Sequence, residues 1–412
     1  MTAEIGLLNK SAVVIAADSA VTIGQGNKVY NNANKIYSLK HCNHIGIMIY
    51  NNANIMEIPV ETIIRLYSIE QTATCRNLVD YSDSFLNFLS TFLKKHVTKE
   101  QVKNGVEINT YLTLDSITES VSDSISENIK SNSKKDLAKK KIELHLEVAK
   151  YILEDLKKTQ IQEDLKKYDY DSFKQDYQEL ISSIIDLHNT HHQLSFNAEF
   201  TDLITEIIYY DSVREINSDD DFTGIIIAGF GEDEIYPGYI ELHINGVIND
   251  TLRWRKIKST SVNNEITAIV RPFAQRDMSD VFFRGVDTEL YSKIIETLED
   301  EYSEIDDYIN KNFRLDEKKK EHLENFLNES INRIHKKITK ISQDEYITPI
   351  IDTIDTFRKE DLIEIAESLI SITSLKRKTS SNIQSVGGPV DIAVITKGEG
   401  FKWIKAKHLK IA

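Results

Sequence analysis

The sequence predicts an α+β protein in which two stacked β-sheets are covered by helices. Short apolar runs come in groups near the beginning, the middle and the end of the chain, and long charged stretches with helical spacing separate these groups. Strands that come in runs favour stacked sheets over the single alternating strands of a Rossmann fold. The chain has 412 residues and is 41% hydrophobic, so it can bury a large core.

The first 50 residues are predicted to form strands at EIGLLN, SAVVIAAD, KVY, KIYSL and IGIMIY, separated by polar or glycine turns such as GQGN. Their nearly continuous apolar character is typical of strands buried on both faces. Two helices should follow, one from about Asn54 through IPVETIIRLY and one through LVDYSDSFLNFLSTFLKKH. Later strands are expected at FTGIIIAGFG, GYIELHING, TLRWRKIK and NEITAIV, and a helix should begin near Pro272. The amphipathic helix KEDLIEIAESLISITSLKRK, the loop SVGGP and the strands VDIAVITK and GFKWIKAK should close the chain.

These elements divide the chain into five expected segments. Residues 1–101 supply the first strands and the helix pair, and residues 102–216 form a charged helical insertion. Residues 217–289 hold the second sheet and the helix after it. A second helical insertion covers 290–341, and residues 342–412 provide the closing helix and the last strands.

Composition excludes several classes of function. With 50 basic and 65 acidic residues the net charge is −15, which argues against general affinity for nucleic acid. The one dense basic cluster, Arg253 to Lys258, is better interpreted as an alternating strand with a solvated face than as a binding patch. Cys42 and Cys75 make no disulfide framework. We expect no signal peptide, because Asp18 interrupts the first apolar run, and no membrane span, so a cytoplasmic location is predicted.

The N-terminus carries the first candidate for chemistry. Met1 precedes Thr2, and the initiator methionine is normally removed when the second residue is small. The first expected strand, EIGLLN, begins only two residues after Thr2. A free α-amine has a pKa near 8, so it could accept the proton of the Thr2 hydroxyl directly or through one water. Nucleophile and base would then lie in one residue, provided that the strand holds it rigidly.

The spacing of two further residues supports Thr2 as a nucleophile. Asp18 ends the second strand in AADSAVT, and Lys35 lies in NANKIYSL. A mature N-terminal Thr, an AAD-x-x-x-T element and a Lys one strand later resemble the proteasome β-subunit family of threonine-type N-terminal nucleophile (Ntn) hydrolases. IGIMIYNNAN, RPFAQ, Gly387-Gly388 and VDIAVITK extend the resemblance to about half of the chain, in the family's order.

The resemblance implies a four-layer αββα Ntn-hydrolase sandwich with two long helical insertions, and roles for single residues. Asp18 would hold Lys35, whose ammonium would lower the pKa of the Thr2 hydroxyl. The backbone N–H of Asn51 would face the developing oxyanion. Thr22 would bind substrate backbone as an added strand does. Each has a simpler alternative, since Asp18 could cap a turn, Lys35 could lie on a strand edge, and a strand threonine needs no such role.

The chain also departs from the family pattern. Arg271 stands where the family has a serine-rich neighbourhood, and KRKTSSNIQSVGG lacks the family's Arg-Asp before the glycine loop, with Ser385 as a partial substitute. The resemblance as a whole leads us to expect an amide hydrolase that acts on peptides, needs no metal or organic cofactor and forms a homo-oligomer. A catalytically silent assembly scaffold or recognition module is the alternative. An unfoldase partner cannot be named from the sequence.

A weaker candidate is a metal site on one helix. His188 and His192 are four residues apart in DLHNTHH and would share a helix face. No cysteine or carboxylate cluster completes the set in the sequence, so no metal site is expected there.

Overall fold

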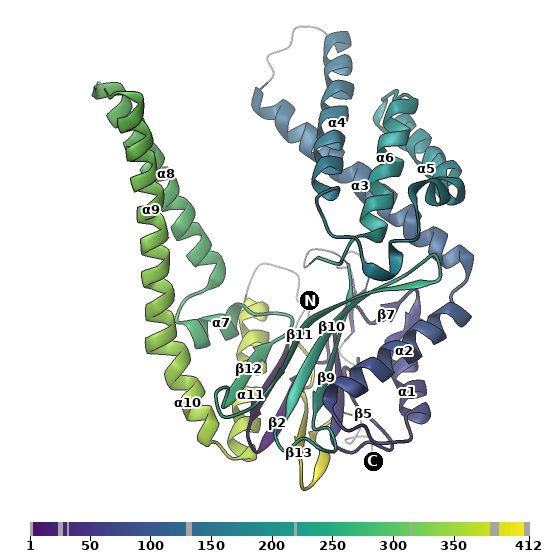
Figure 1. The fold of residues 1–412 in the computed structure, drawn as a ribbon, viewed down its shortest axis with the longest axis vertical. Coiled ribbons are helices and arrows are strands. Elements are labelled where there is room, and N and C mark those ends of the chain that lie inside the picture. The colour runs from purple at the N-terminus through teal and green to yellow at the C-terminus, as the bar shows by residue number, and fades with distance from the viewer. Residues whose placement is uncertain are drawn as a thin grey trace.

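Two five-stranded antiparallel sheets form the centre of the computed structural model, which describes residues 3–23, 28–30, 33–128, 134–217, 221–313, 315–379 and 387–407 (Figure 1). The chain is thus a mixed α/β protein, which confirms the predicted class at that level. The first sheet has the order β12-β1-β2-β13-β14. Its strands are β1 (Glu4–Asn9), β2 (Ala12–Ala17), β12 (Ala268–Pro272), β13 (Asp391–Thr396) and β14 (Gly400–Lys405).

The second sheet has the order β11-β10-β9-β6-β5. Its strands are β5 (Ile36–Ser38), β6 (Ile45–Asn51), β9 (Thr223–Gly229), β10 (Gly238–Ile248) and β11 (Thr251–Ser261). Two small hairpins flank the sheets, namely β3 (Val21–Ile23) with β4 (Lys28–Tyr30), and β7 (Asn54–Ile55) with β8 (Ile58–Pro59). The segment 217–289 is therefore shared, because β12 belongs to the first sheet.

Alternation along the strands explains how both faces of each sheet are covered. In β1 and β2 every residue is buried. Leu8 and Ile15 belong to a core between the sheets, whereas Leu7 and Val14 belong to a core under helices. Successive strand residues point to opposite faces, so a continuous apolar run satisfies two cores at once.

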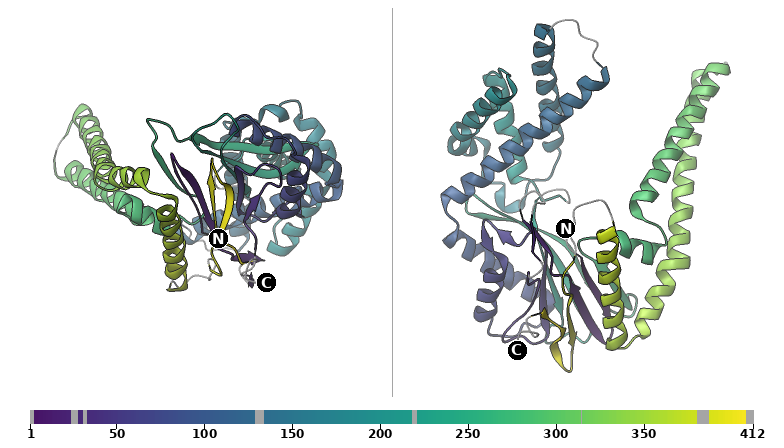
Figure 2. Two further views of the ribbon diagram at one scale, coloured as in Figure 1. Left: turned by 90° about the horizontal axis from the view of Figure 1, so that it is seen from below. Right: turned by 180° about the vertical axis from the view of Figure 1, so that it is seen from behind.

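Helices cover the outer faces of the sheets. On the second sheet lie α1 (Val60–Glu70) and α2 (Leu78–His96), which share a core with β6, β9 and β10. Against the first sheet pack α7 (Asp277–Arg284), α10 (Thr348–Thr356) and α11 (Lys359–Thr379). Figure 2 shows these helices on opposite sides of the paired sheets.

The region after α2 is a helical body with its own core. It contains α3 (Lys99–Asn128), α4 (Lys134–Leu156), the short 3₁₀-helix η1 (Glu163–Leu165), α5 (Tyr170–His192) and α6 (Ala198–Val213). Arg253 of β11 joins this body to the second sheet, because its Nη2 donates to the carbonyl of Asp211 across 2.8 Å. The basic run was correctly interpreted as a strand, but this anchoring role of Arg253 was not foreseen.

A second helical region projects as a long hairpin from the same end of the sheets as the first (Figures 1 and 2). It consists of α8 (Thr288–Asn312) and α9 (Glu317–Ile341), and neither helix has a buried residue. The π-helical segment η2 (Ser342–Ile347) connects α9 to α10. No helix in the described parts of the chain combines the length and the apolar character that crossing a bilayer requires.

Two predicted helix starts were wrong. The helix expected from about Asn54 begins at Val60, because Met56 and Glu57 take left-handed backbone angles (φ 49° and 65°) and turn the chain into the β7–β8 hairpin. The helix expected near Pro272 begins at Asp277. Pro272 instead ends an edge strand, where its missing N–H costs no ladder bond.

Candidate active site

Strand pairing brings three charged residues to one end of the sheets. Glu4 is the first residue of β1 and pairs with Ala17, the last residue of β2. Asp18 follows at once, and its backbone N–H donates to the carbonyl of Ala3 across 3.0 Å. Lys35 precedes β5, and its carbonyl accepts from the N–H of Ile49 in β6 across 2.9 Å. The N-terminal strand and the second sheet therefore meet at this point.

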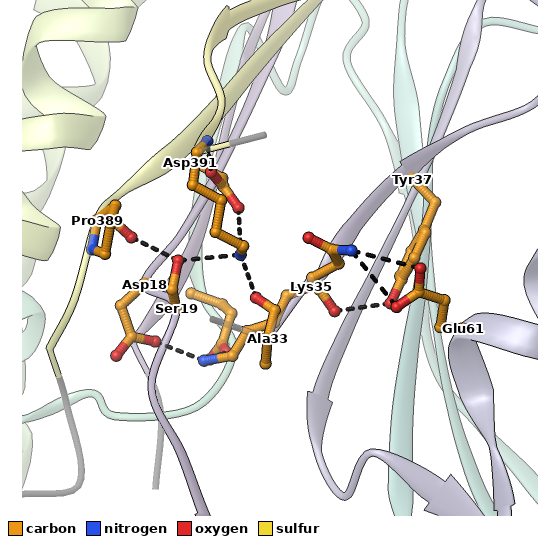
Figure 3. Close-up of polar contacts among 11 residues, drawn as sticks. Asp18, Ser19, Ala33, Lys35, Tyr37, Glu61, Pro389 and Asp391 are labelled. Atoms are coloured by element: carbon orange, nitrogen blue, oxygen red, sulfur yellow. Dashed lines mark hydrogen bonds and ion pairs between the residues drawn. The ribbon is translucent and has the colours of Figure 1, made fainter. Parts of the chain in front are cut away.

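The side chains of Glu4, Asp18 and Lys35 form a buried acid–lysine cluster. Nζ of Lys35 lies 2.5 Å from Oδ1 of Asp18 and 3.1 Å from Oε1 of Glu4. The three residues are 1%, 1% and 3% exposed, respectively. Figure 3 shows Lys35 reaching toward Asp18 from the neighbouring segment. One ammonium is thus shared by two carboxylates away from solvent.

Backbone donors complete the coordination of Asp18. Oδ1 accepts from the N–H of Ala3 at 3.1 Å, and Oδ2 accepts from the N–H of Gly387 at 2.8 Å. Burying a carboxylate costs several kcal/mol unless ion pairs and hydrogen bonds compensate it. Asp18 obtains both kinds of compensation, and in doing so it joins the N-terminal strand, Lys35 and the loop before β13.

A second ion pair lies beside this cluster and was missed by the sequence analysis. Nζ of Lys407 is 2.8 Å from Oδ2 of Asp391 and 3.0 Å from Oγ of Ser19 (Figure 3). The Ser19 hydroxyl donates to the carbonyl of Pro389 across 2.6 Å. Asp391 is 3% exposed. No local pattern links these residues, because their contact depends on how the two ends of the chain pack.

The structure describes only some of the other predicted site residues. Thr2 and Ser385 lie outside the described residues. Thr22 pairs with Val29 in the β3–β4 hairpin, and its side chain is not among those described. Asn51 ends β6 with φ 66°, the left-handed region that favours glycine, and its Nδ2 donates to the carbonyl of Phe222.

Asn51 lies at the same end of the second sheet as Lys35. Its strand neighbour Ile49 is hydrogen-bonded to Lys35, and Asn51 itself pairs with Thr223 at the start of β9. Glu4 was not predicted as a site residue. A charge at the start of the apolar strand EIGLLN was the one signal that could have identified it.

Arg271 takes part in a polar network between the two sheets. Its Nη2 donates to Oε2 of Glu241 across 2.9 Å, and the Tyr50 hydroxyl donates to Oε1 of the same carboxylate across 2.7 Å. Nε2 of His243 is 2.7 Å from the Tyr50 oxygen. Burial first, and then the negative charge of Glu241, raise the pKa of Tyr50 far above its usual range. Tyr50 is therefore a neutral hydrogen-bonding group in this network.

Comparison with known proteins gives only a distant link. No family model and no curated protein matches the chain. Among solved structures, a Gly-1 mutant of Anbu from Hyphomicrobium sp. strain MC1 is 9% identical, with a TM-score of 0.33 and coverage of 99% of this chain and 88% of that one. Anbu, titled an ancestral beta-subunit, from Yersinia bercovieri is 9% identical with a TM-score of 0.28, covering 98% and 88% of the two chains.

These values correct the family assignment made from the sequence. Assignment to the proteasome β-subunit family is wrong as stated, because no family model matches and the Anbu structures are similar only at this low level. The motifs that suggested the family are short. Asp18 follows a buried strand and Lys35 precedes a later one, and two charges at such places do not define a family without matching sequence around them. Similarity at this level also supports no conclusion about a reaction.

Proposed function

We propose that this protein is a threonine-type Ntn amide hydrolase in which removal of Met1 frees Thr2 as the nucleophile. One observation carries the proposal. The buried Asp18 carboxylate binds both the Lys35 ammonium and the backbone N–H of Ala3, the residue that is peptide-bonded to Thr2. A charged pair fixed to the second residue of a trimmed chain is well placed to act on the first residue.

In the proposed reaction, Oγ of Thr2 attacks the amide carbonyl carbon and its proton passes to the α-amine. The tetrahedral intermediate collapses to an ester on Thr2, and the proton goes to the leaving amine. The α-amine then activates a water molecule that hydrolyses the ester and restores Thr2. Lys35 would lower the pKa of the Thr2 hydroxyl, and the backbone N–H of Asn51 would stabilise the oxyanion. Thr22 would bind the substrate backbone, and Ser385 would partly substitute for the family's residues before the glycine loop.

The arrangement of the sheets is consistent with this proposal. Two sheets enclosed by α1 and α2 on one side and by α11 on the other would constitute the αββα sandwich of an Ntn hydrolase. We propose that the two helical insertions control access to the site. The first insertion ends with α6 and leads into Thr223, which pairs with Asn51. The second insertion comes after β12, whose last residue, Pro272, pairs with Ile5. Both connections are at the end of the sheets that holds the acid–lysine cluster.

We also propose that the substrate is a peptide and that copies of the protein associate with one another. The α8–α9 hairpin has no buried residue and carries exposed apolar side chains such as Leu290, Tyr308 and Phe326, as a helical arm that packs on another copy would. Sedimentation velocity of the full chain tests this part. A monomer at micromolar concentration would contradict it.

The reaction is tested by intact mass of protein expressed without an N-terminal tag, before and after treatment with a peptide epoxyketone. This reagent requires a hydroxyl and an adjacent free amine. We expect loss of Met1 and one adduct per chain, and no adduct on Thr2→Ala. Complete retention of Met1 would refute the mechanism and leave the silent scaffold as the better account.

A further inference from the structure

The first helical insertion brings three metal-binding side chain types together. His188 and His192 lie one turn apart on α5, and Asp115 lies on the neighbouring helix α3. One ligand atom from each residue lies within 4.8 Å of those of the other two. From the sequence no site was expected here, because no cysteine or carboxylate cluster completed the set. Packing of α3 against α5 supplies it from a residue that is distant in sequence.

We propose that Asp115, His188 and His192 bind one divalent transition-metal ion of the zinc class. Two imidazole nitrogens and one carboxylate oxygen form a donor set that zinc accepts, with bond lengths of about 2.0–2.2 Å. Ligand atoms around such an ion are about 3–4 Å apart, so the side chains need to approach by about 1 Å. Asp115 and His192 are the exposed members of the set, so their side chains would make that movement toward the buried His188. Magnesium and calcium prefer oxygen ligands and fit the set less well.

The helix geometry and a neighbouring hydroxyl orient the ligands. Residues four apart on a helix share one face, and the rings of His188 and His192 have centroids 4.3 Å apart. The Thr118 hydroxyl donates to the carbonyl of Leu114 across 2.8 Å and lies 3.1 Å from Nε2 of His188. With that proton used, the Thr118 oxygen can accept from Nε2–H of His188, and in this tautomer Nδ1 keeps its lone pair for a metal ion. Metal-binding histidines are commonly fixed by a hydrogen bond of this kind.

The cluster is anchored on one side and open on the other. His188 is buried at 5% exposure, whereas Asp115 and His192 are exposed. An ion can therefore enter from solvent, and water can complete its coordination. A bound ion would cross-link α3 to α5 and stabilise the folded helical body by mass action.

The test uses the full chain after treatment with a chelator and its removal. Zn²⁺ affinity is measured by competition with a chromophoric chelator in millimolar Mg²⁺, which suppresses binding to scattered carboxylates. Co²⁺ absorption spectra report the coordination directly. Asp115→Asn and His192→Ala change exposed ligands and leave the buried His188 in place. His191→Ala is the matched control, because His191 is adjacent and exposed but does not belong to the cluster.

We expect one ion per chain, a thermal stabilisation by Zn²⁺, and a loss of affinity of about tenfold or more in both ligand variants. His191→Ala should bind as the wild type does. Absence of a stoichiometric site, or unchanged affinity in Asp115→Asn and His192→Ala, would overturn the proposal. Equal weakening by His191→Ala would also overturn it. None of these readouts depends on Thr2 or on hydrolysis.

Discussion

Lys35 donates from Nζ to Oδ1 of Asp18 across 2.5 Å, and both side chains are buried. The same oxygen accepts the backbone N–H of Ala3 at 3.1 Å. One carboxylate thus fixes the position of a lysine and of the N-terminal strand together. Substitutions in this pair should affect chemistry at Thr2 and stability in ways that can be measured separately.

The first prediction concerns reactivity. Asp18→Asn keeps the size of the side chain but removes the nearer of the two carboxylate charges that hold Lys35, so epoxyketone labelling and amide hydrolysis should slow by about 10²–10⁴-fold. Labelling rates followed by intact mass provide the measurement. Glu61→Gln is the control, because Glu61 is a nearby carboxylate that binds Asn34 and Arg65. A normal labelling rate in Asp18→Asn would contradict the role assigned to the pair.

The second prediction concerns stability and does not depend on activity. Lys35→Met leaves Glu4 and Asp18 buried without their shared ammonium, and breaking a buried ion pair in this way costs about 3–5 kcal/mol. The comparison is the ion pair of Lys10 and Asp355 at 3.9 Å, in which Lys10 is exposed and Asp355 is half-buried. Lys10→Met should cost less than about 1 kcal/mol. Urea unfolding of both variants measures the difference, and equal losses would show that the cluster contributes no special stability.

The sequence predicted the mixed α/β class because the periodicities of strands and helices are local properties. Asp18 and Lys35 were identifiable for a similar reason, as charges that border apolar runs. Their contact depends on strand pairing, which local spacing does not specify. The helix starts at Val60 and Asp277 were missed because backbone turns, rather than apolar periodicity, decide them.

Residues that meet only through tertiary packing could not be predicted. Asp391 and Lys407 reach Ser19 from the opposite end of the chain. Asp115 joins His188 and His192 because two helices pack with a particular register, and no local pattern contains that register. Sequence spacing therefore identified His188 and His192, which share one helix, whereas only the packing of α3 against α5 could supply Asp115.

The third prediction is a loss of stability in acid caused by His243. Its ring stacks on Phe222 with centroids 3.5 Å apart, and burial followed by the charges of Arg255 and Arg271 lowers its pKa to about 4. Its ring is therefore neutral at pH 7, and its 4.0 Å approach to Glu241 is not an ion pair at that pH.

An unfolded histidine has a pKa of about 6.5, so between pH 6.5 and pH 4 the unfolded chain binds the extra proton. The stability associated with neutral His243 is complete above about pH 6.5 and declines as the pH falls toward 4, by up to about 2–3 kcal/mol. Urea unfolding at pH 7 and pH 4.5 should show this decline reduced in His243→Gln. The exposed His41→Gln should retain the wild-type slope. Equal slopes in all three proteins would exclude His243 as the source.

The fourth prediction compares two glycines with opposite environments. A Cβ atom added to Gly224 would lie 2.1 Å from Cε1 of Tyr50, so Gly224→Ala must displace a ring that binds Glu241 and His243. Overpacking of this kind costs about 1–3 kcal/mol. Gly105 lies inside α3 with no atom within 4 Å of an added Cβ, and Gly105→Ala should stabilise by about 0.5–1 kcal/mol through helix propensity. Unfolding midpoints should therefore shift in opposite directions, and a neutral Gly224→Ala would show that Tyr50 can move without loss and that its network is not a rigid part of the core.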